Sequence, residues 1–157
     1  GTMPGVALTP LVAEDICLVG PYEAGLSLDT PVSPQHLASV PMIMLDAANH
    51  VRRRIESLLG QLGLSLNPAM EMEGQPLTFE MVRRGLGHTV LPRSAAHREI
   101  ATGRMSAAPI AGATLGWSLA VSRTRADAPE VRALTELLHE LAQTRIDEGA
   151  WQQSAAQ

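Results

Sequence analysis

The chain has 157 residues, of which 45% are hydrophobic and 18% charged, an ordinary composition for one globular domain with its own core. Its net charge of -4 argues against a surface that grips nucleic acid, because phosphate binding needs clustered basic residues. The single cysteine, Cys17, excludes an intrachain disulfide framework and a cysteine-rich zinc site. The sequence has neither an apolar run long enough to span a membrane nor a signal-peptide pattern, so we expect a cytoplasmic protein without a membrane partner.

The first half of the chain alternates short apolar segments with turns. The clearest element is a helix in which Val51, Ile55 and Leu59 follow the helical period and Gly63 supplies the stop. Short, continuous apolar runs elsewhere predict buried strands. In chain order we expect strands at 6–8 and 16–19, a turn-rich break at 20–25, a short helix at 35–39, a strand at 41–45 and the helix at 50–62.

The second half continues the alternation of strands and helices. Asp127 and Glu130 have the spacing of a capping box, which predicts the start of a final helix at 129–146. The other expected elements are a strand near 70–73, a helix that ends at Gly85, a strand at 88–91, a helix at 95–101, and strands at 105–110 and 115–121 separated by small residues at 111–113. This order of elements indicates an open α/β sheet, in which ligands bind beyond the carboxyl ends of the strands.

Two turns are candidate ligand-binding segments, because each leads from a predicted strand into the N-terminus of a helix. Free N–H groups and the positive end of the helix dipole suit a carboxylate or a phosphate there. The first turn contains Asp46, Ala47, Ala48 and Asn49, and the second contains Gly74 and Gln75. We expect both turns at one edge of the sheet, where they would contact a small effector.

His88 and Thr89 are further candidate effector contacts, because they lie at a junction between predicted elements. A structural or surface role is the alternative for His88. Glu71 and Glu73 could serve acid–base chemistry, but their alternation with methionines favours the solvated side of a strand. The run Arg52-Arg53-Arg54 lies largely off the apolar stripe of its helix, which favours a solvated face over a contact with an acidic group.

Other catalytic and cofactor signatures are weak or missing in the sequence. The histidines lack metal-ligand spacing, and no serine lies in a G-x-S-x-G elbow. Gly85-x-Gly87 is not a dinucleotide fingerprint, because Val90 occupies the position of the third glycine. We therefore expect ligand binding without catalysis, without a cofactor and without a metal.

The stretch MVRRGLGHTVLP, residues 81–92, resembles a motif in the effector-binding domain of LysR-type transcriptional regulators. The likeness extends over the chain. LVAEDICLVGPYEAG (11–25) is similar to a family stretch and keeps Glu14 and Gly20, although Glu23-Ala24-Gly25 departs from the usual His-Pro. The other similar segments are SPQHLASVPMIML (33–45), HVRRRIESLLGQLGLSLNPAMEMEG (50–74), LPRSAAHREIATGRMSAAPI (91–110) and TLGWSLAVSRTRADAPEVRALTELL (114–138).

The resemblance implies an open Rossmann-like α/β sheet of periplasmic-binding-protein type II, with one subdomain nearly complete plus remnants of the other. A small effector would bind in the cleft, and DNA would be bound only through an N-terminal domain that this sequence lacks. The implied division places the first subdomain at 1–20 and 111–150, the second at 21–110 and a polar tail at 151–157. The expected hinge residues are Gly20, Pro21, Ile110, Ala111 and Gly112.

Two other functions remain open at this stage. One is a stand-alone solute-binding α/β protein, and the other is a small enzyme that uses His88 or Glu73. A truncated first subdomain would also leave the apolar faces of 115–121 and 129–146 uncovered, and self-association would follow.

Overall fold

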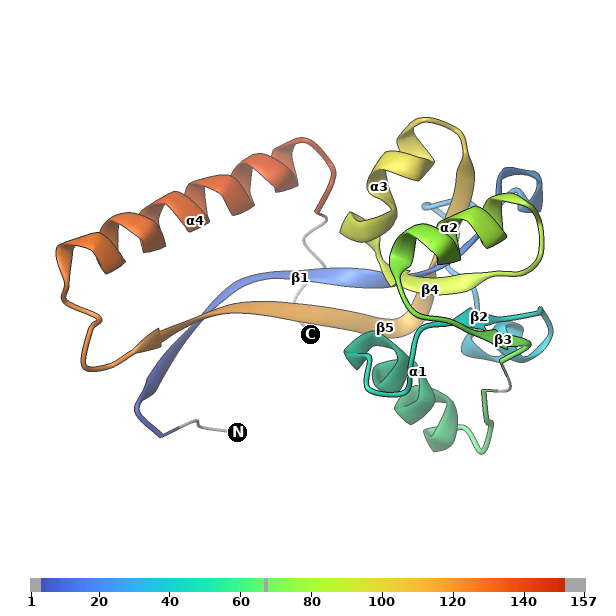
Figure 1. The fold of residues 1–157 in the computed structure, drawn as a ribbon, viewed down its shortest axis with the longest axis horizontal. Coiled ribbons are helices and arrows are strands. Elements are labelled where there is room, and N and C mark those ends of the chain that lie inside the picture. The colour runs from blue at the N-terminus through green and yellow to red at the C-terminus, as the bar shows by residue number, and fades with distance from the viewer. Residues whose placement is uncertain (1–3, 67, 152–157) are drawn as a thin grey trace. The chain divides into compact units, whose positions relative to one another are not determined.

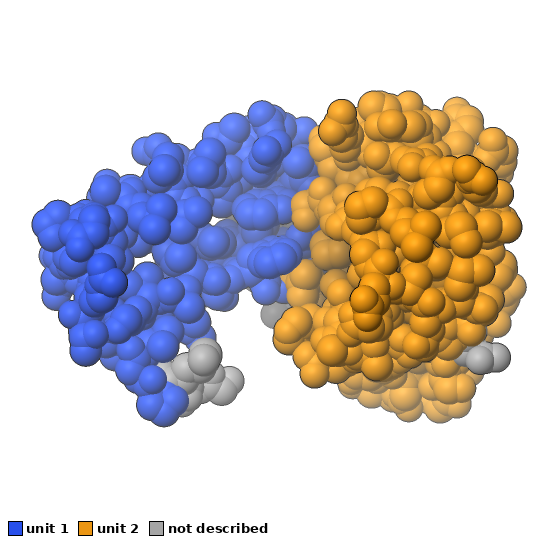
Figure 2. All heavy atoms as spheres, in the orientation of Figure 1, with its two compact units in different colours: residues 1–14, 116–157 blue, residues 15–115 orange. Residues whose placement is uncertain are grey.

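A computed structural model describes residues 4–66 and 68–151, which form two compact units. Unit 1 is built from residues up to 14 and from 116 onward, and unit 2 comprises residues 15–115 (Figure 2). All of the predicted tail except Trp151 lies outside the described residues. The mixture of helices and strands confirms the predicted α/β class.

The strands of unit 2 lie in one continuous row. Strands β1 (Val6–Pro21), β4 (Thr89–Pro92) and β5 (Met105–Ser122) form a sheet in the order β4-β1-β5. Strand β2 (Ile43–Met44) pairs in parallel with β3 (Met70–Glu71). A parallel bridge between Met42 and His88 places β2 beside the start of β4, and the His88 carbonyl accepts the Ile43 N–H at 2.7 Å. The order across unit 2 is therefore β3-β2-β4-β1-β5.

Helices cover both faces of this row (Figure 1). Along β1, Ile16 and Leu18 belong to one buried cluster and Cys17 and Val19 to the other, as the two-residue period of a strand requires. Helix α1 (His50–Gln61) adds Ile55 and Leu59 to the first cluster. Helices α2 (Gln75–Arg83) and α3 (Arg93–Ala101) add Val82 and Ala96 to the second. Two short 3-10 helices, Tyr22–Ala24 and Pro34–Ala38, complete unit 2.

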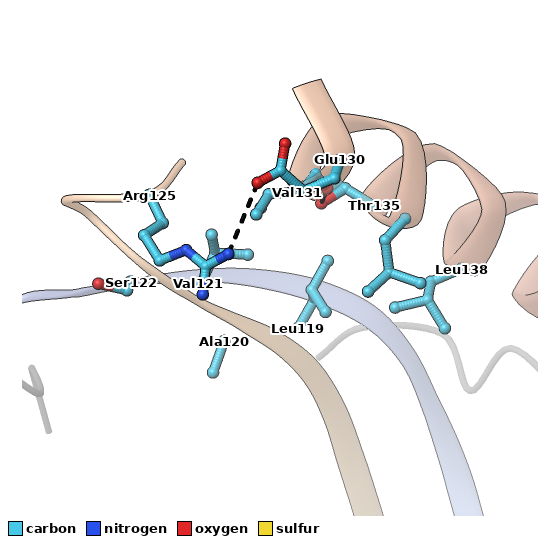
Figure 3. A pocket seen from close by; sticks show the side chains of 10 residues that line it. Leu119, Ala120, Val121, Ser122, Arg125, Glu130, Val131, Thr135 and Leu138 are labelled. Atoms are coloured by element: carbon cyan, nitrogen blue, oxygen red, sulfur yellow. Dashed lines mark hydrogen bonds and ion pairs between the residues drawn. The ribbon is translucent and has the colours of Figure 1, made fainter. Parts of the chain in front are cut away.

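Unit 1 contains the start of β1, the end of β5 and helix α4 (Pro129–Asp147). The Arg123 N–H donates to the Gly5 carbonyl at 2.9 Å, and the Trp117 indole N–H donates to the buried Glu14 carboxylate. Trp151, beyond the end of α4, stacks on Trp117 with ring centroids 6.5 Å apart. A groove of about 420 Å3 runs between β5 and α4 and is lined mainly by Leu119, Val121, Val131, Leu134 and Leu138 (Figure 3).

The structure differs from the sequence-based expectation in the long strands and in the division of the chain. The predicted breaks at Pro10 and at 111–113 lie inside β1 and β5, which are continuous. The two units divide at 14/15 and 115/116, whereas the expected junctions at 20/21 and 110/111 lie inside unit 2. The chain therefore passes from one unit to the other inside β1 and again inside β5. The sequence has no turn signal at either point.

The expected hinge residues accordingly belong to the sheet of unit 2. Gly20 and Pro21 close β1 at the end away from the crossing, and the Pro21 carbonyl accepts the Ser106 hydroxyl at 2.8 Å. Ile110 is buried in the core and bridges to Val32, while Ala111 and Gly112 continue β5. The predicted capping box of α4 is wrong, because Ala128 occupies the N-cap position and, among the described residues, no side chain makes a capping hydrogen bond at this helix start.

Candidate functional site

The two candidate effector turns lie at one edge of the sheet of unit 2. Strands β2 and β3 are parallel, with Ile43 opposite Met70 and Met44 opposite Glu71, and the Met72 N–H donates to the Met44 carbonyl at 3.0 Å. Both strands therefore end at the same edge, where β2 leads into 46–49 and β3 leads into 74–75. The arrangement is the one expected from the sequence, and it is the edge at which open α/β sheets bind ligands.

The first turn is exposed and internally hydrogen-bonded. The Asp46 carboxylate accepts the Ala48 N–H at 2.7 Å, and the Asp46 carbonyl accepts the Asn49 N–H at 3.0 Å. The Asn49 side chain caps α1 by accepting the N–H groups of Val51 and Arg52 at 3.0 and 3.2 Å. Because this cap already occupies two donors of the helix N-terminus, the turn offers a ligand the remaining N–H groups and the Asp46 carboxylate.

The second turn begins α2 without a capping side chain. Gly74 has a φ of 87°, a backbone conformation that favours glycine, and no side chain caps the helix within the described residues. The Gln75 amide donates to the Ala95 carbonyl at 3.3 Å, which ties this turn to the first turn of α3. A pocket of about 360 Å3 opens beside it, lined by Gln75, Pro76, Phe79, Arg83 and Glu99.

Arg52 departs from its sequence-based interpretation. Arg53 and Arg54 are exposed as predicted, but Arg52 is only 8% exposed. Its guanidinium donates to Glu71 at 2.8 Å, to Glu56 at 2.8 Å and to the Leu45 carbonyl at 2.9 Å. The hydrogen bonds to Glu71 and then Glu56 raise the pKa of Arg52, so this side chain stays charged.

His88 and Thr89 lie away from the two turns, at the opposite edge of the sheet. His88 pairs with Met42, the residue before β2, so it lies at the amino ends of the parallel strands and not at their carboxyl ends. Asp46 is four residues after Met42, which corresponds to about 13 Å for an extended chain. The glycine turn at 85–87 leads into β4, whereas the 46–49 and 74–75 turns lead out of strands, so His88 and Thr89 do not lie with those two turns.

His88 lies against the C-terminal end of β1. Its ring packs against the backbone of Gly20, where an added Cβ would lie 2.6 Å from His88 Cδ2. Burial lowers the pKa of His88, the nearby His36 lowers it further, and the Pro41 backbone opposes the shift. Thr89 is 1% exposed and His88 is partly buried.

A third turn lies at the same edge as 46–49 and 74–75, and it was not predicted from the sequence. Strand β4 is parallel to β2 and ends at Pro92, after which Arg93 and Ser94 begin α3. Pro92 lies opposite Ile16 of β1, close to where the chain enters unit 2. The strand-to-helix rule that identified the other two turns applies equally to LPRS, so the signal was present in the sequence.

The described part of the chain contains neither a candidate metal site nor a helix that could span a membrane. Residues 4–66 and 68–151 contain no group of three or more His, Cys, Asp or Glu side chains that could hold a metal ion. In the same residues, none of the helices combines the length and the apolar character needed to cross a membrane.

Comparison with known proteins identifies the family. The LysR substrate binding domain matches residues 1–143. The chain belongs to this family. It is 24% identical over 150 residues to the HTH-type transcriptional regulator BbuR of Bordetella bronchiseptica, and the match covers 94% of the chain but 46% of BbuR. The chain thus spans less than half the length of that relative.

Solved structures of LysR-type regulators confirm the periplasmic-binding-protein type II fold. A mutant of OxyR from Corynebacterium glutamicum superposes with a TM-score of 0.75 at 19% identity, covering 94% of this chain and 47% of OxyR. The CcmR regulatory domain of Synechocystis, solved in complex with 2-PG, gives 0.72 at 13% identity and covers 87% and 67%. The resemblance to the LysR effector-binding domain is therefore confirmed, over the alternative of an unrelated solute-binding protein.

Proposed function

We propose that the chain senses a small anionic metabolite, most simply a carboxylate, and passes its bound state to a DNA-binding domain. The observation that carries the proposal is the convergence of the 46–49 and 74–75 turns at the carboxyl edge of β2 and β3. The CcmR regulatory domain, a structural neighbour, is solved with 2-PG, which supports small-molecule binding in this fold. We include the Arg93–Ser94 turn at the same edge in the proposed site.

The proposed edge offers both acceptors and donors. The exposed Asp46 carboxylate can accept hydrogen bonds from ligand hydroxyls, whereas backbone N–H groups at the start of α2 can donate to a ligand carboxylate. A hydroxylated carboxylate fits this edge better than a simple fatty acid, because its hydroxyl can donate to Asp46, whereas the Asp46 charge repels either anion. The Asp46→Asn variant should therefore bind the same acid more tightly, and Glu23→Gln, at the other end of unit 2, serves as the charge control.

Backbone amide shifts measured during titration with a panel of small organic acids test the site. We expect the largest changes at Ala47, Asn49 and Gln75 for at least one hydroxylated carboxylate, and none for its uncharged amide. Responses confined to Gly63, Gly103 or His88 would place binding elsewhere and contradict the proposal.

We further propose that this chain binds without catalysing a reaction. His88 and Glu73, the residues named for the enzyme alternative, lie at opposite edges of the sheet, so they cannot act together on one bond. BbuR, a relative of this chain, is a transcriptional regulator. Turnover of a panel acid, measured by NMR over hours, would contradict this part of the proposal.

Because the chain is acidic, with a net charge of -4, we expect it to bind DNA only as part of a longer regulator. A gel-shift assay with the labelled promoter of its own gene tests this, with random DNA of equal length as control. Specific retention of the promoter by this chain alone would show a DNA-binding surface and refute the expectation.

A further inference from the structure

Arg52 contacts the segments that lead into both candidate effector turns. Its Nη1 donates to the carbonyl of Leu45, the residue before Asp46, and its Nη2 donates to Glu71, the last residue of β3. Its backbone N–H is held by the Asn49 side chain. One residue thus connects the end of β2, the end of β3 and the N-terminal cap of α1.

The geometry of this contact is specific to arginine. The guanidinium is planar and carries five donors in a fixed fork, so three acceptors in different directions define its orientation. Nε completes the set by donating to Glu56 at 2.8 Å, one turn further along α1. A lysine would place a single flexible point charge there and could not hold all three acceptors in the same arrangement.

In the ion pairs of Arg52 with Glu71 and Glu56, the arginine is buried and the two carboxylates are partly exposed. Arg52 itself is nearly inaccessible, but the side chain of Glu71 is 54% exposed and that of Glu56 is 38% exposed. Buried ion pairs contribute little net stability compared with apolar residues of equal volume, and their best-attested role is to specify one arrangement. A ligand or a substitution that moves Glu71 therefore acts directly on the Arg52 guanidinium, which also holds the Leu45 carbonyl before the 46–49 turn.

We propose that Arg52 is a positioning residue that holds the 46–49 and 74–75 turns in one fixed arrangement, so that a change at one turn is felt at the other. The coupling itself follows from the contacts of Arg52. Its importance for effector affinity rests on the proposed function of this edge.

A double-mutant cycle read by backbone amide shifts tests the coupling without a ligand. Glu71→Gln should shift the amides of Ala47, Ala48 and Asn49 in the wild-type chain. In an Arg52→Met background the same change should have little effect on them, because the connection is gone. Arg54→Met, an exposed arginine of the same helix, is the matched background and should leave the shifts as in wild type.

The outcome that overturns the proposal is an equal response in both backgrounds. Strands β2 and β3 are also joined by backbone hydrogen bonds, such as Met72 N–H to the Met44 carbonyl, and equal shifts would mean that these transmit the change. If Arg52→Met does not fold, Arg52→Lys replaces it. It should reduce the response at Ala47–Asn49 at least by half, whereas an undiminished response again overturns the proposal.

A binding experiment then separates this inference from the proposed function. With the panel acid that binds the wild-type chain best, Arg52→Lys should raise Kd roughly tenfold, an ordinary size for coupled sites, and Arg54→Lys should leave it unchanged. Binding that Arg52→Lys alters less than twofold refutes the positioning role while the effector site stands. Failure of every acid to bind refutes the effector site, and the shift cycle still decides the coupling.

Discussion

Units 1 and 2 share two strands, yet those strands meet very different surroundings. In unit 2, β1 buries Ile16, Leu18 and Val19 completely between two layers of helices. In unit 1 the same strand leaves Leu8 49% exposed, and Trp117 of β5 is 42% exposed. An apolar strand is therefore not a buried strand until other segments cover both of its faces, and the described residues of unit 1 supply only one helix.

The largest expected effect contrasts the helices of the two units. Ile55→Ala in α1 removes a fully buried side chain and should lower the free energy of unfolding of unit 2 by about 2–5 kcal/mol. Leu137→Ala in α4 changes a side chain that is 50% exposed and should cost less than about 1 kcal/mol. Urea unfolding followed by circular dichroism measures both losses of free energy. Tryptophan fluorescence is a second probe that reports on unit 1, because both tryptophans lie there. Equal losses would mean that α4 is covered in solution.

A second contrast lies within unit 2, between two glycines. A Cβ at Gly87 would lie 2.8 Å from the Pro41 carbonyl oxygen, so Gly87→Ala should destabilise the chain by about 1–3 kcal/mol. Gly60 lies inside α1 with open space around its Cα, and Gly60→Ala should stabilise by about 0.5–1 kcal/mol. In thermal unfolding, Gly87→Ala should lower the melting temperature and Gly60→Ala should raise it. A stable Gly87→Ala variant would show that β2 and β4 can move apart.

The exposed face of α4 leads to a prediction about association. Leu134, Leu137 and Leu141 are each about half exposed, and the groove beside them is apolar. Because such a patch is typical of an interface, we expect the chain to self-associate at micromolar concentration or above. Leu134→Glu and Leu141→Glu should shift the mass in light scattering toward the monomer, with Leu62→Glu, an exposed leucine after α1, as control. A monomer of the wild-type chain at high concentration would refute this prediction.

Local signals explain why much of the fold could be predicted from the sequence. The capping oxygen of Asn49, the apolar period of α1 and the glycine stop at Gly63 all act within a few residues, and the structure confirms that helix to within one residue of its predicted end. The same holds for the two turns at the carboxyl edge. Each turn joins the end of a parallel strand to the start of the next helix, so the order of elements predicts the edge at which it lies.

Features that depend on distant partners could not be predicted in this way. Strand β5 continues through 111–113 because a neighbouring strand holds it, whereas the sequence there resembles a joint. The burial of Arg52 depends on Glu71, which is close in space but not in sequence. The capping box failed because Ala128 and not Asp127 occupies the N-cap position, and the Asp127 carboxylate accepts from Arg132 at 3.0 Å. Local pattern identifies elements, and pairing across the chain decides their length and burial.

The smallest expected effect is a pH dependence that separates the two edges of unit 2. The pKa of His88 is lowered by burial, so the folded chain binds this proton less readily than the unfolded chain does. Stability should be undiminished above the ordinary histidine value of 6.5, decline as the pH falls below it, and level off once the pH passes the lowered pKa. Thermal unfolding between pH 7.5 and about 5 measures this contribution.

Substitution assigns that pH dependence to one side chain. His88→Gln removes the titrating group and should flatten the decline, whereas His139→Gln, on the exposed face of α4, should leave it unchanged. Because His88 lies at the edge away from the proposed effector turns, the affinity of His88→Gln for the best panel acid should match that of the wild-type chain at pH 7.5. If His88→Gln keeps its pH dependence, the titrating group lies elsewhere. If instead its affinity falls, the entry edge of the strands takes part in binding, and the separation of the two edges argued from the parallel pairing of Met42 and His88 would be wrong.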